Sequence, residues 1–248
     1  EKAVLLPTAH DEPYIYFPIF KRIFTSARAF IYLTPEEKSF VESLFPVKHK
    51  DNCVVGSGVE LPENIDSEIF KKSYHITDKY IVYVGRIEPS KGCNEMFQIF
   101  SEYKRTYPQD NIKLVLMGKT SMDIPRRDDI IYIGFVSEED KFNGISGASA
   151  LWLPSQFESL SIAVLEAMAL GIPVIVNGKC EVLKGHCERS EAGVYYNNSD
   201  EAVNKLNTLI NKTNMNVLSE KARRYVEENY QWDAIIKKVE QLIWAINE

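Results

Sequence analysis

Two glutamates have the spacing and setting for chemistry on a charged ligand. Glu158 and Glu166 lie eight residues apart, and the sequence around them predicts a helix from about Ser161 to Leu170. Residues three and four positions from Glu166 on this helix are all apolar, so its carboxylate should lie on a largely buried face. A lone buried carboxylate is costly, and we therefore expect Glu166 to have a partner.

Glu158 comes just before this helix, where free backbone N–H groups and the positive helix end can receive an anion. These N–H groups belong to Leu160, Ser161 and Ile162. A simpler interpretation stays open for each glutamate. Glu158 then serves only as a helix N-terminal charge, and Glu166 only pairs with an Arg or Lys of the core.

Arg86 and Lys91 supply positive charge on a second loop, after an apolar run that ends at Gly85. Arginine can bind two phosphate oxygens at once while lysine places a point charge, a combination suited to a diphosphate. The alternative is that both are ordinary surface cations. The sequence has no Asp-x-Asp pair to hold a divalent metal on a diphosphate, so we expect fixed cations and a helix N-terminus instead, and no metal cofactor.

A repeating strand and helix pattern positions these residues. Near-continuous apolar runs alternate with helical segments, which predicts an α/β, Rossmann-like fold with a parallel sheet covered on both faces. Ligands of such sheets bind at the carboxyl ends of the strands, so residues 85–86, 134–136 and 155–158 should converge on one rim. The expected strands are residues 53–56, 80–85, 113–118, 130–135, 150–154 and 173–178, and the expected helices include 92–108 and 137–148.

The first 45 residues predict a strand, a loop, a helix, a short strand at 30–33 and a helix from Pro35. Thr34 is the expected N-cap, and Glu36 and Glu37 in the first turn should favour the helix dipole. This is only about one and a half βα units, too little to bury a core of its own, so we expect the segment to dock on other structure.

The last third of the sequence reads as helical, in segments 199–212, 216–230 and 231–248. The final helix has an apolar stripe, part of which we expect to be exposed. The stripe comprises Trp232, Ile235, Ile236, Val239, Leu242, Ile243 and Ile246.

Composition excludes several classes of protein. The 248 residues are 45% hydrophobic and 26% charged, typical of a globular protein, and the net charge of −6 argues against nucleic acid as a partner. No apolar run approaches the roughly 18 residues of a membrane span. Four scattered cysteines favour a reducing cytosol, and Cys180, His186 and Cys187 lack the fourth ligand of a structural zinc site.

Several stretches resemble one known family. FESLSIAVLEAMALGIPVI, residues 157–175, resembles the E-x7-E region of the retaining GT-B glycosyltransferases of the family 4 type. VYVGRIEPSKG, residues 82–92, resembles their donor-phosphate loop. VVGSGVEL, residues 54–61, resembles the start of the donor-binding domain, and NYQWDAIIKKVEQLIWAI, residues 229–246, its closing helix. The resemblance spans nearly the whole chain in the right order.

The resemblance implies a role for each site residue. Glu158 would orient the donor sugar and Glu166 would hold the ribose hydroxyls, while Arg86 and Lys91 would bind the diphosphate. His10 would close over the sugar from the acceptor side. Further contacts to the donor would come from the backbone at Gly85, Leu160, Ser161 and Ile162, and from Phe135 and Val136 at the base.

The resemblance also implies a domain division and an activity. Residues 1–52 would be the tail of an acceptor-side domain, 53–228 the donor-binding domain, and 229–248 a helix crossing back, so that the chain is a fragment of a longer enzyme. The implied reaction is metal-independent transfer of a sugar, with retention, from a UDP- or GDP-sugar. The acceptor would be a glycan or a lipid-linked saccharide in polysaccharide biosynthesis, in the cytoplasm or at the inner membrane surface by peripheral contact.

Two departures from the family pattern and two other functions stay open. Ser161 stands where the family often has glycine, and NGKCEVLKGHC, residues 177–187, replaces the usual Gly-Gly turn. The chain could alternatively belong to a GT-B-type nucleotide-sugar epimerase or phosphorylase, or be a non-catalytic nucleotide-sugar-binding module. An exposed sheet edge would also allow a homo-oligomer.

Overall fold

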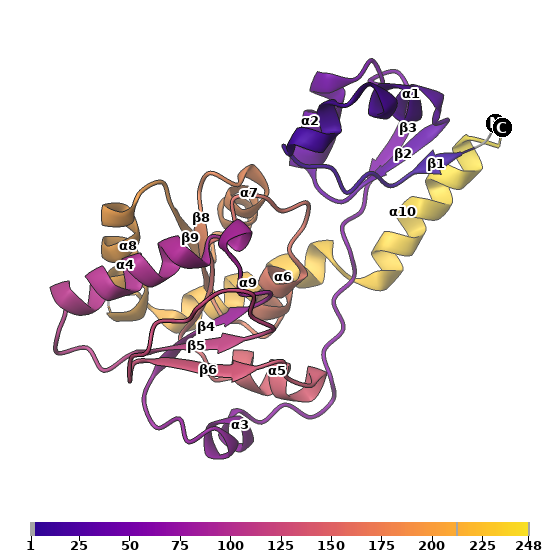
Figure 1. Ribbon diagram of the computed structural model, residues 1–248. Helices are drawn as coiled ribbons and strands as arrows, with labels where there is room; N and C mark the ends of the chain where they lie inside the picture. Colours follow the sequence, from indigo (N-terminus) through magenta and orange to yellow (C-terminus); the bar gives the residue numbers. More distant parts are fainter. Residues whose placement is uncertain (1–2, 212, 248) are drawn as a thin grey trace.

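Two parallel sheets form the framework of the chain (Figure 1). The computed structural model describes residues 3–211 and 213–247, so residues 1–2, 212 and 248 of the predicted terminal segments lie outside the described residues. The smaller sheet has the order β1-β2-β3, with strands Val4–Leu5, Ala29–Tyr32 and Asp51–Val54. The larger has the order β6-β5-β4-β7-β8-β9, with β4 Tyr80–Val84, β5 Lys113–Met117, β6 Ile130–Gly134, β7 Ala150–Leu153, β8 Val174–Asn177 and β9 Gly193–Tyr196.

Helices cover both faces of the larger sheet. Helix α4 packs with α8 on one face, and α3, α5, α6 and α9 form a connected layer on the other (Figure 1). The helices are α1 Pro18–Ser26, α2 Pro35–Leu44, α3 Ser67–Ser73, α4 Cys93–Thr106, α5 Glu138–Ser146, α6 Ile162–Ala169, α7 Glu181–Ser190, α8 Ser199–Asn211, α9 Met215–Asn229 and α10 Trp232–Ala245, with short 3-10 turns η1 Pro13–Tyr16 and η2 Pro89–Lys91. The α/β, Rossmann-like architecture with parallel strands is as predicted.

The continuous apolar runs are buried because helices lie above and below them. Every residue of β7 and β8 is buried, as are four of the five residues of β4. Strand β9 and helix α7, which no sequence pattern singled out, complete the sheet and its cover.

The first strand predicted for the larger sheet belongs instead to the smaller sheet. Residues 53–56 were expected to open the donor-side sheet, but Asp51–Val54 pairs in parallel with β2, so that Phe30 lies opposite Asn52. The proposed domain boundary after residue 52 therefore falls inside a strand. With this third strand the N-terminal segment does have a small core, contrary to expectation, whose members include Phe24, Phe30, Val41 and Phe45.

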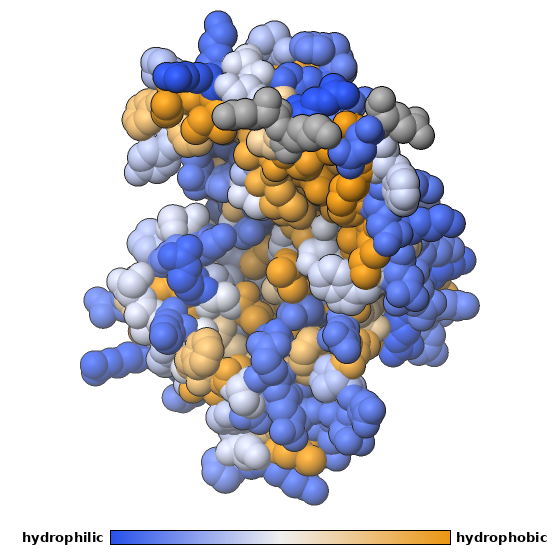
Figure 2. Space-filling view, turned by 90° about the vertical axis from the view of Figure 1, so that its right-hand side faces the viewer, coloured by the Kyte–Doolittle hydropathy of each residue, from blue (hydrophilic) through white to orange (hydrophobic). Residues whose placement is uncertain are grey.

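The C-terminal helix returns to the N-terminal sheet, where α10 lies along β3 (Figure 1). Its apolar stripe is divided as expected: Ile235 and Leu242 are buried, whereas Trp232, Ile236 and Ile243 are exposed. Figure 2 shows apolar residues gathered on the upper part of this side of the molecule. Residues 4–23 contribute further exposed apolar side chains, among them Val4, Leu6, Tyr14, Tyr16, Phe17, Ile19 and Ile23.

The order of the larger sheet creates one point where successive crossovers diverge. From β4 the chain runs outward to β5 and β6, and then returns to place β7 on the other side of β4. The loops that follow β4 and β7 therefore lie at the point where the strand order reverses, which is where ligands of such sheets bind. These loops carry the predicted basic and acidic residues.

Candidate functional site

The loops after β4 and β7 meet through an ion pair. Lys91 Nζ lies 2.8 Å from Glu158 Oε1, and both side chains are mostly buried. The approach of the loops depends on Gly92, whose φ of +76° and position leave no room for a side chain: an added Cβ would lie 2.4 Å from the carbonyl oxygen of Pro154. The structure thus brings together two of the predicted site residues from different loops.

The backbone before α6 is held in a strained conformation. Ser161, the N-cap, has φ +69° in the left-handed region, which costs a residue with a side chain about 1–2 kcal/mol. This is the position where the resemblance expects glycine, and the positive φ gives the reason for that preference. Leu160 is buried and Ile162 is half exposed, and the N–H groups of Leu160, Ser161 and Ile162 lie at the start of the helix.

Glu166 is buried, as predicted, and its partner is Lys141 on α5. Glu166 is 8% exposed, and its Oε1 lies 2.7 Å from Lys141 Nζ, which also pairs with Glu138. Burial raises the pKa of Glu166, against the opposing effect of Lys141. Burial would lower the pKa of Lys141, but hydrogen bonds to Glu138 and Glu166 more than offset it, and its pKa is raised. No pattern in the sequence pointed to Lys141 as this partner.

Arg86 lies at the outer end of the β4 loop with its side chain largely in solvent. Its guanidinium is 3.2 Å from Glu88, and its backbone carbonyl accepts a hydrogen bond from the Tyr83 hydroxyl at 2.6 Å. Gly85 has φ +148°, and an added Cβ would lie 3.2 Å from that hydroxyl. Arg86 is therefore on the predicted rim but does not contact Lys91 or Glu158.

Phe135 and Val136 follow β6 on the same rim. The Phe135 side chain is 77% exposed, and Lys119 Nζ lies 5.3 Å from the centre of its ring. Val136 is half-buried against the main core. An exposed aromatic ring at the carboxyl end of a parallel strand can stack with a planar group such as a nucleotide base.

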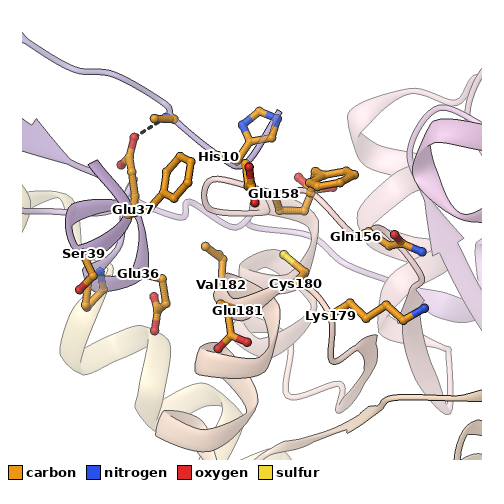
Figure 3. A pocket seen from close by; sticks show the side chains of 15 residues that line it. His10, Glu36, Glu37, Ser39, Gln156, Glu158, Lys179, Cys180, Glu181 and Val182 are labelled. Carbon is orange, nitrogen blue, oxygen red and sulfur yellow. Dashed lines mark hydrogen bonds between the residues drawn. The ribbon is translucent and has the colours of Figure 1, made fainter. Parts of the chain in front are cut away.

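His10 lies opposite these loops, across a pocket between the two sheets. The pocket has a volume of about 570 Å³ and is lined from one side by His10, Glu36 and Phe40 and from the other by Phe157 and Glu158. Figure 3 shows His10 above Glu158, with α2 forming the opposite wall. The His10 and Phe157 rings are 6.3 Å apart, and His10 Nε2 lies 3.0 Å from Glu12.

Glu37, Lys179 and Cys180 also line the pocket, and no pattern in the sequence indicated a place for them there. Glu37 lies in the first turn of α2 as predicted, and its carboxylate turns inward and accepts hydrogen bonds from the backbone N–H groups of Ala9 and Leu33. Burial raises its pKa, and these N–H groups oppose the rise. The Thr34 N-cap itself is as predicted, with Thr34 Oγ1 accepting from Glu37 N–H at 3.1 Å.

A buried histidine fixes the loop before α6. His186 Nε2 lies 2.7 Å from the Leu160 carbonyl oxygen, and Nδ1 lies 2.9 Å from the Tyr225 hydroxyl. Burial lowers the pKa of His186 to about 4, so the ring is neutral at pH 7 and has one N–H. A carbonyl oxygen can only accept, so Nε2–H donates to Leu160 and Nδ1 accepts from Tyr225.

The network continues to the N-terminal sheet. The Tyr225 hydroxyl donates its proton to His186, and therefore accepts from Arg189 Nε at 3.3 Å and from the Tyr230 hydroxyl at 3.1 Å. Arg189 also forms an ion pair with Glu36 on α2. Hydrogen bonds thus connect the start of α6 with the opposite side of the pocket.

Neither a metal cluster nor a membrane span is found in the described part of the chain. Among residues 3–211 and 213–247, no group of three or more His, Cys, Asp or Glu side chains could hold a metal ion. His186 is engaged by Tyr225 and Leu160. No helix in the same residues is long and apolar enough to cross a membrane.

The class of protein follows from this fold and from the family model that matches it. Residues 65–232 match the family "Glycosyl transferases group 1". The matched region is more than half of the chain, and the chain therefore belongs to this family. Two relatives are an uncharacterized glycosyltransferase of Haemophilus influenzae, 26% identical over 224 residues, and the lipopolysaccharide 1,2-N-acetylglucosaminetransferase of Salmonella typhimurium, 27% identical over 182. These matches cover 86% and 65% of this chain, but only 60% and 47% of the relatives.

Solved structures share the arrangement of both sheets. HepE of Anabaena, solved in complex with UDP and glucose, superposes with a TM-score of 0.78 over 98% of this chain and 72% of its own, at 15% identity. Sucrose-phosphate synthase of Thermosynechococcus elongatus gives 0.77 over 98% of this chain and 67% of its own, at 18% identity. At this level of identity, the similarity shows the fold alone.

Proposed function

We propose that the protein transfers a sugar from a nucleotide-diphosphate sugar, UDP- or GDP-linked, to a carbohydrate or lipid-linked acceptor, with retention of configuration. The observation that carries the proposal is the contact between Lys91 and Glu158 at the divergence of the β4 and β7 loops, opposite His10. A cation for the leaving phosphate and a carboxylate for the sugar are then side by side. Membership of the glycosyltransferase family supports this interpretation.

The diphosphate is held by positive groups of the chain itself. Lys91 and Arg86 provide fixed cations, and the N-termini of α4 and α6 provide N–H groups and positive dipole ends. Charge that develops on the leaving diphosphate as the glycosidic bond breaks is stabilised there without a metal ion. Glu158 orients the sugar hydroxyls, and His10 contacts the sugar from the acceptor side.

The nucleoside occupies the outer part of the rim. Glu166, held by Lys141, accepts hydrogen bonds from the ribose hydroxyls, and the base lies against the backbone of Phe135 and Val136. The solved HepE complex contains UDP and the Salmonella relative is named for lipopolysaccharide synthesis. These relatives favour a UDP-sugar and a saccharide acceptor. We place the reaction in polysaccharide biosynthesis, in the cytoplasm or at the inner membrane surface.

Calorimetry tests the donor site directly. The protein is titrated with UDP, GDP and ADP, each with excess EDTA and again with Mg²⁺. Binding of UDP or GDP that is equally tight in EDTA is the expected result, because fixed cations neutralise the diphosphate. Binding that requires Mg²⁺ would overturn metal independence, and failure of all three nucleotides to bind would overturn the donor site in this chain.

A further inference from the structure

Glu37 is a buried carboxylate next to the pocket that the proposed chemistry does not use. Glu37 is only 1% exposed to solvent. Oε1 accepts the N–H of Ala9 at 2.6 Å, and Oε2 accepts the N–H of Leu33 at 2.6 Å. Both oxygens are therefore engaged with backbone groups from two separate segments, which offsets much of the cost of burying the carboxylate.

One of these segments carries His10. Ala9 directly precedes His10 in the connection between β1, which ends at Leu5, and η1, which begins at Pro13. This connection contains Thr8 with φ +49°, a left-handed conformation that persists only when surrounding contacts impose it. The bond from Ala9 to Glu37 is such a contact, and Figure 3 shows it as the dashed line at the pocket wall.

Among the described residues, the polar contacts of the His10 side chain are all within its own loop, and across the pocket its ring meets only the Phe157 ring, at 6.3 Å. Nε2 pairs with Glu12 at 3.0 Å, and Nδ1 lies 3.4 Å from the Thr8 carbonyl oxygen. Glu37 instead fixes the backbone beside His10 to the first turn of α2. That turn is in contact with the donor-side loop, because Thr34 Oγ1 donates to the Ser159 carbonyl at 3.3 Å.

We propose that Glu37 is a positioning residue that sets the place of His10 over the donor sugar. The inference rests on the proposed function, in which His10 contacts that sugar. A carboxylate is needed because each of its two oxygens accepts one backbone N–H; the amide of glutamine has a single acceptor oxygen and leaves one N–H facing an NH2 group. Glu37 itself does not touch the substrate.

Separate titrations with UDP and UDP-glucose measure the contribution of the sugar to binding, and GDP and GDP-mannose replace them if the protein binds GDP. The variants are Glu37→Gln, His10→Ala and the double variant. Glu42→Gln serves as the matched control, because it makes the same change on the same helix at a pair with Lys38 that does not line the pocket. Circular dichroism checks the fold, and Glu37→Asp, which withdraws the carboxylate by one methylene, is a second variant.

Glu37→Gln should lower the affinity for the nucleotide sugar relative to the nucleotide by about fivefold, the scale of one hydrogen bond. His10→Ala should have a similar effect, the double variant no larger one, and Glu42→Gln none. Equal losses for nucleotide and nucleotide sugar, or losses that add fully to those of His10→Ala, would overturn the inference. Failure of the unmodified protein to bind any nucleotide would instead overturn the proposed function, and the inference with it.

Discussion

At the scale of single residues, the site is built from two lysine–glutamate pairs with different surroundings. Lys91 pairs with Glu158, which lines the pocket, whereas Lys141 and Glu166 form a pair between helices α5 and α6. In each pair a carboxylate oxygen accepts a hydrogen bond from a neighbouring ammonium group. A ligand diphosphate would share Lys91, and ribose hydroxyls would donate to Glu166.

Removing one member of either pair should weaken nucleotide binding. We expect Lys91→Ala and Glu166→Ala each to cost about 1–3 kcal/mol of binding free energy, the scale of a charged hydrogen bond. Calorimetric titration with the nucleotide that the unmodified protein binds measures this change. Lys71→Ala, which removes an exposed ammonium paired with Glu68 on α3, is the control and should bind normally. Unchanged affinity in both site variants would contradict the proposed roles.

At the scale of elements, α7 holds the start of α6. His186 on α7 donates to the Leu160 carbonyl, and the next residue, Ser161, is in the strained left-handed conformation from which α6 begins. Strain of this kind persists because neighbouring groups over-determine the backbone. The helix that replaces the expected Gly-Gly turn therefore contributes to the shape of the glutamate loop.

The burial of His186 makes the free energy of unfolding depend on pH. The pKa of His186 is about 4 in the folded protein and 6.5 as its ordinary value, so the unfolded chain binds the proton more tightly. The stabilisation that the neutral His186 ring contributes to the folded state is complete above pH 6.5. It is lost as the pH falls toward 4, by up to about 1.4 kcal/mol per pH unit. Denaturant unfolding from pH 7 to 4 measures it.

His186→Gln is the matched variant, because its amide can donate to Leu160 and accept from Tyr225 without titrating. The difference in unfolding free energy between the unmodified protein and this variant should shrink or reverse as the pH is lowered from 6.5 to 4. A difference that stays constant across this range would show that His186 is not buried in the neutral form.

At the scale of the whole molecule, the two sheets are joined by close packing of the linker against the C-terminal helices. Val59 N–H donates to the Tyr230 carbonyl at 3.1 Å. Gly58 faces the Trp232 side chain so closely that an added Cβ would lie 2.3 Å from the indole. On the far side of this junction α10 lies along β3, so the junction sets how the two sheets are placed across the pocket.

Gly58→Ala should therefore destabilise the protein. The added methyl group overlaps the indole, and overpacking of this kind typically costs about 1–3 kcal/mol. Thermal unfolding of the single variant, of Trp232→Ala and of the double variant separates the causes. The alanine at position 58 should cost much less when the indole is absent, and an equal cost in both backgrounds would rule out this contact as the cause.

The local pattern of the sequence predicted most of the larger sheet but not the sheet to which each strand belongs. Strands β4 to β8 have continuous apolar runs that only a sheet covered on both faces can bury, and these were predicted. Residues 53–56 were predicted as the first strand of the same sheet, yet the strand that forms is Asp51–Val54, and it pairs with β2. Apolar content specifies that a strand is buried, and its neighbours depend on the path of the chain.

The sequence by itself determined the rim of the site. Parallel strands bring their carboxyl ends to one edge, so loops that follow β4 and β7 had to carry Lys91 and Glu158 to the same region. Only the tertiary structure decided the partners of the buried charges: Lys141 for Glu166, and the Ala9 N–H for Glu37. The physical reason is that such partners come from separate elements, and the packing of those elements, which local sequence does not encode, sets their distance.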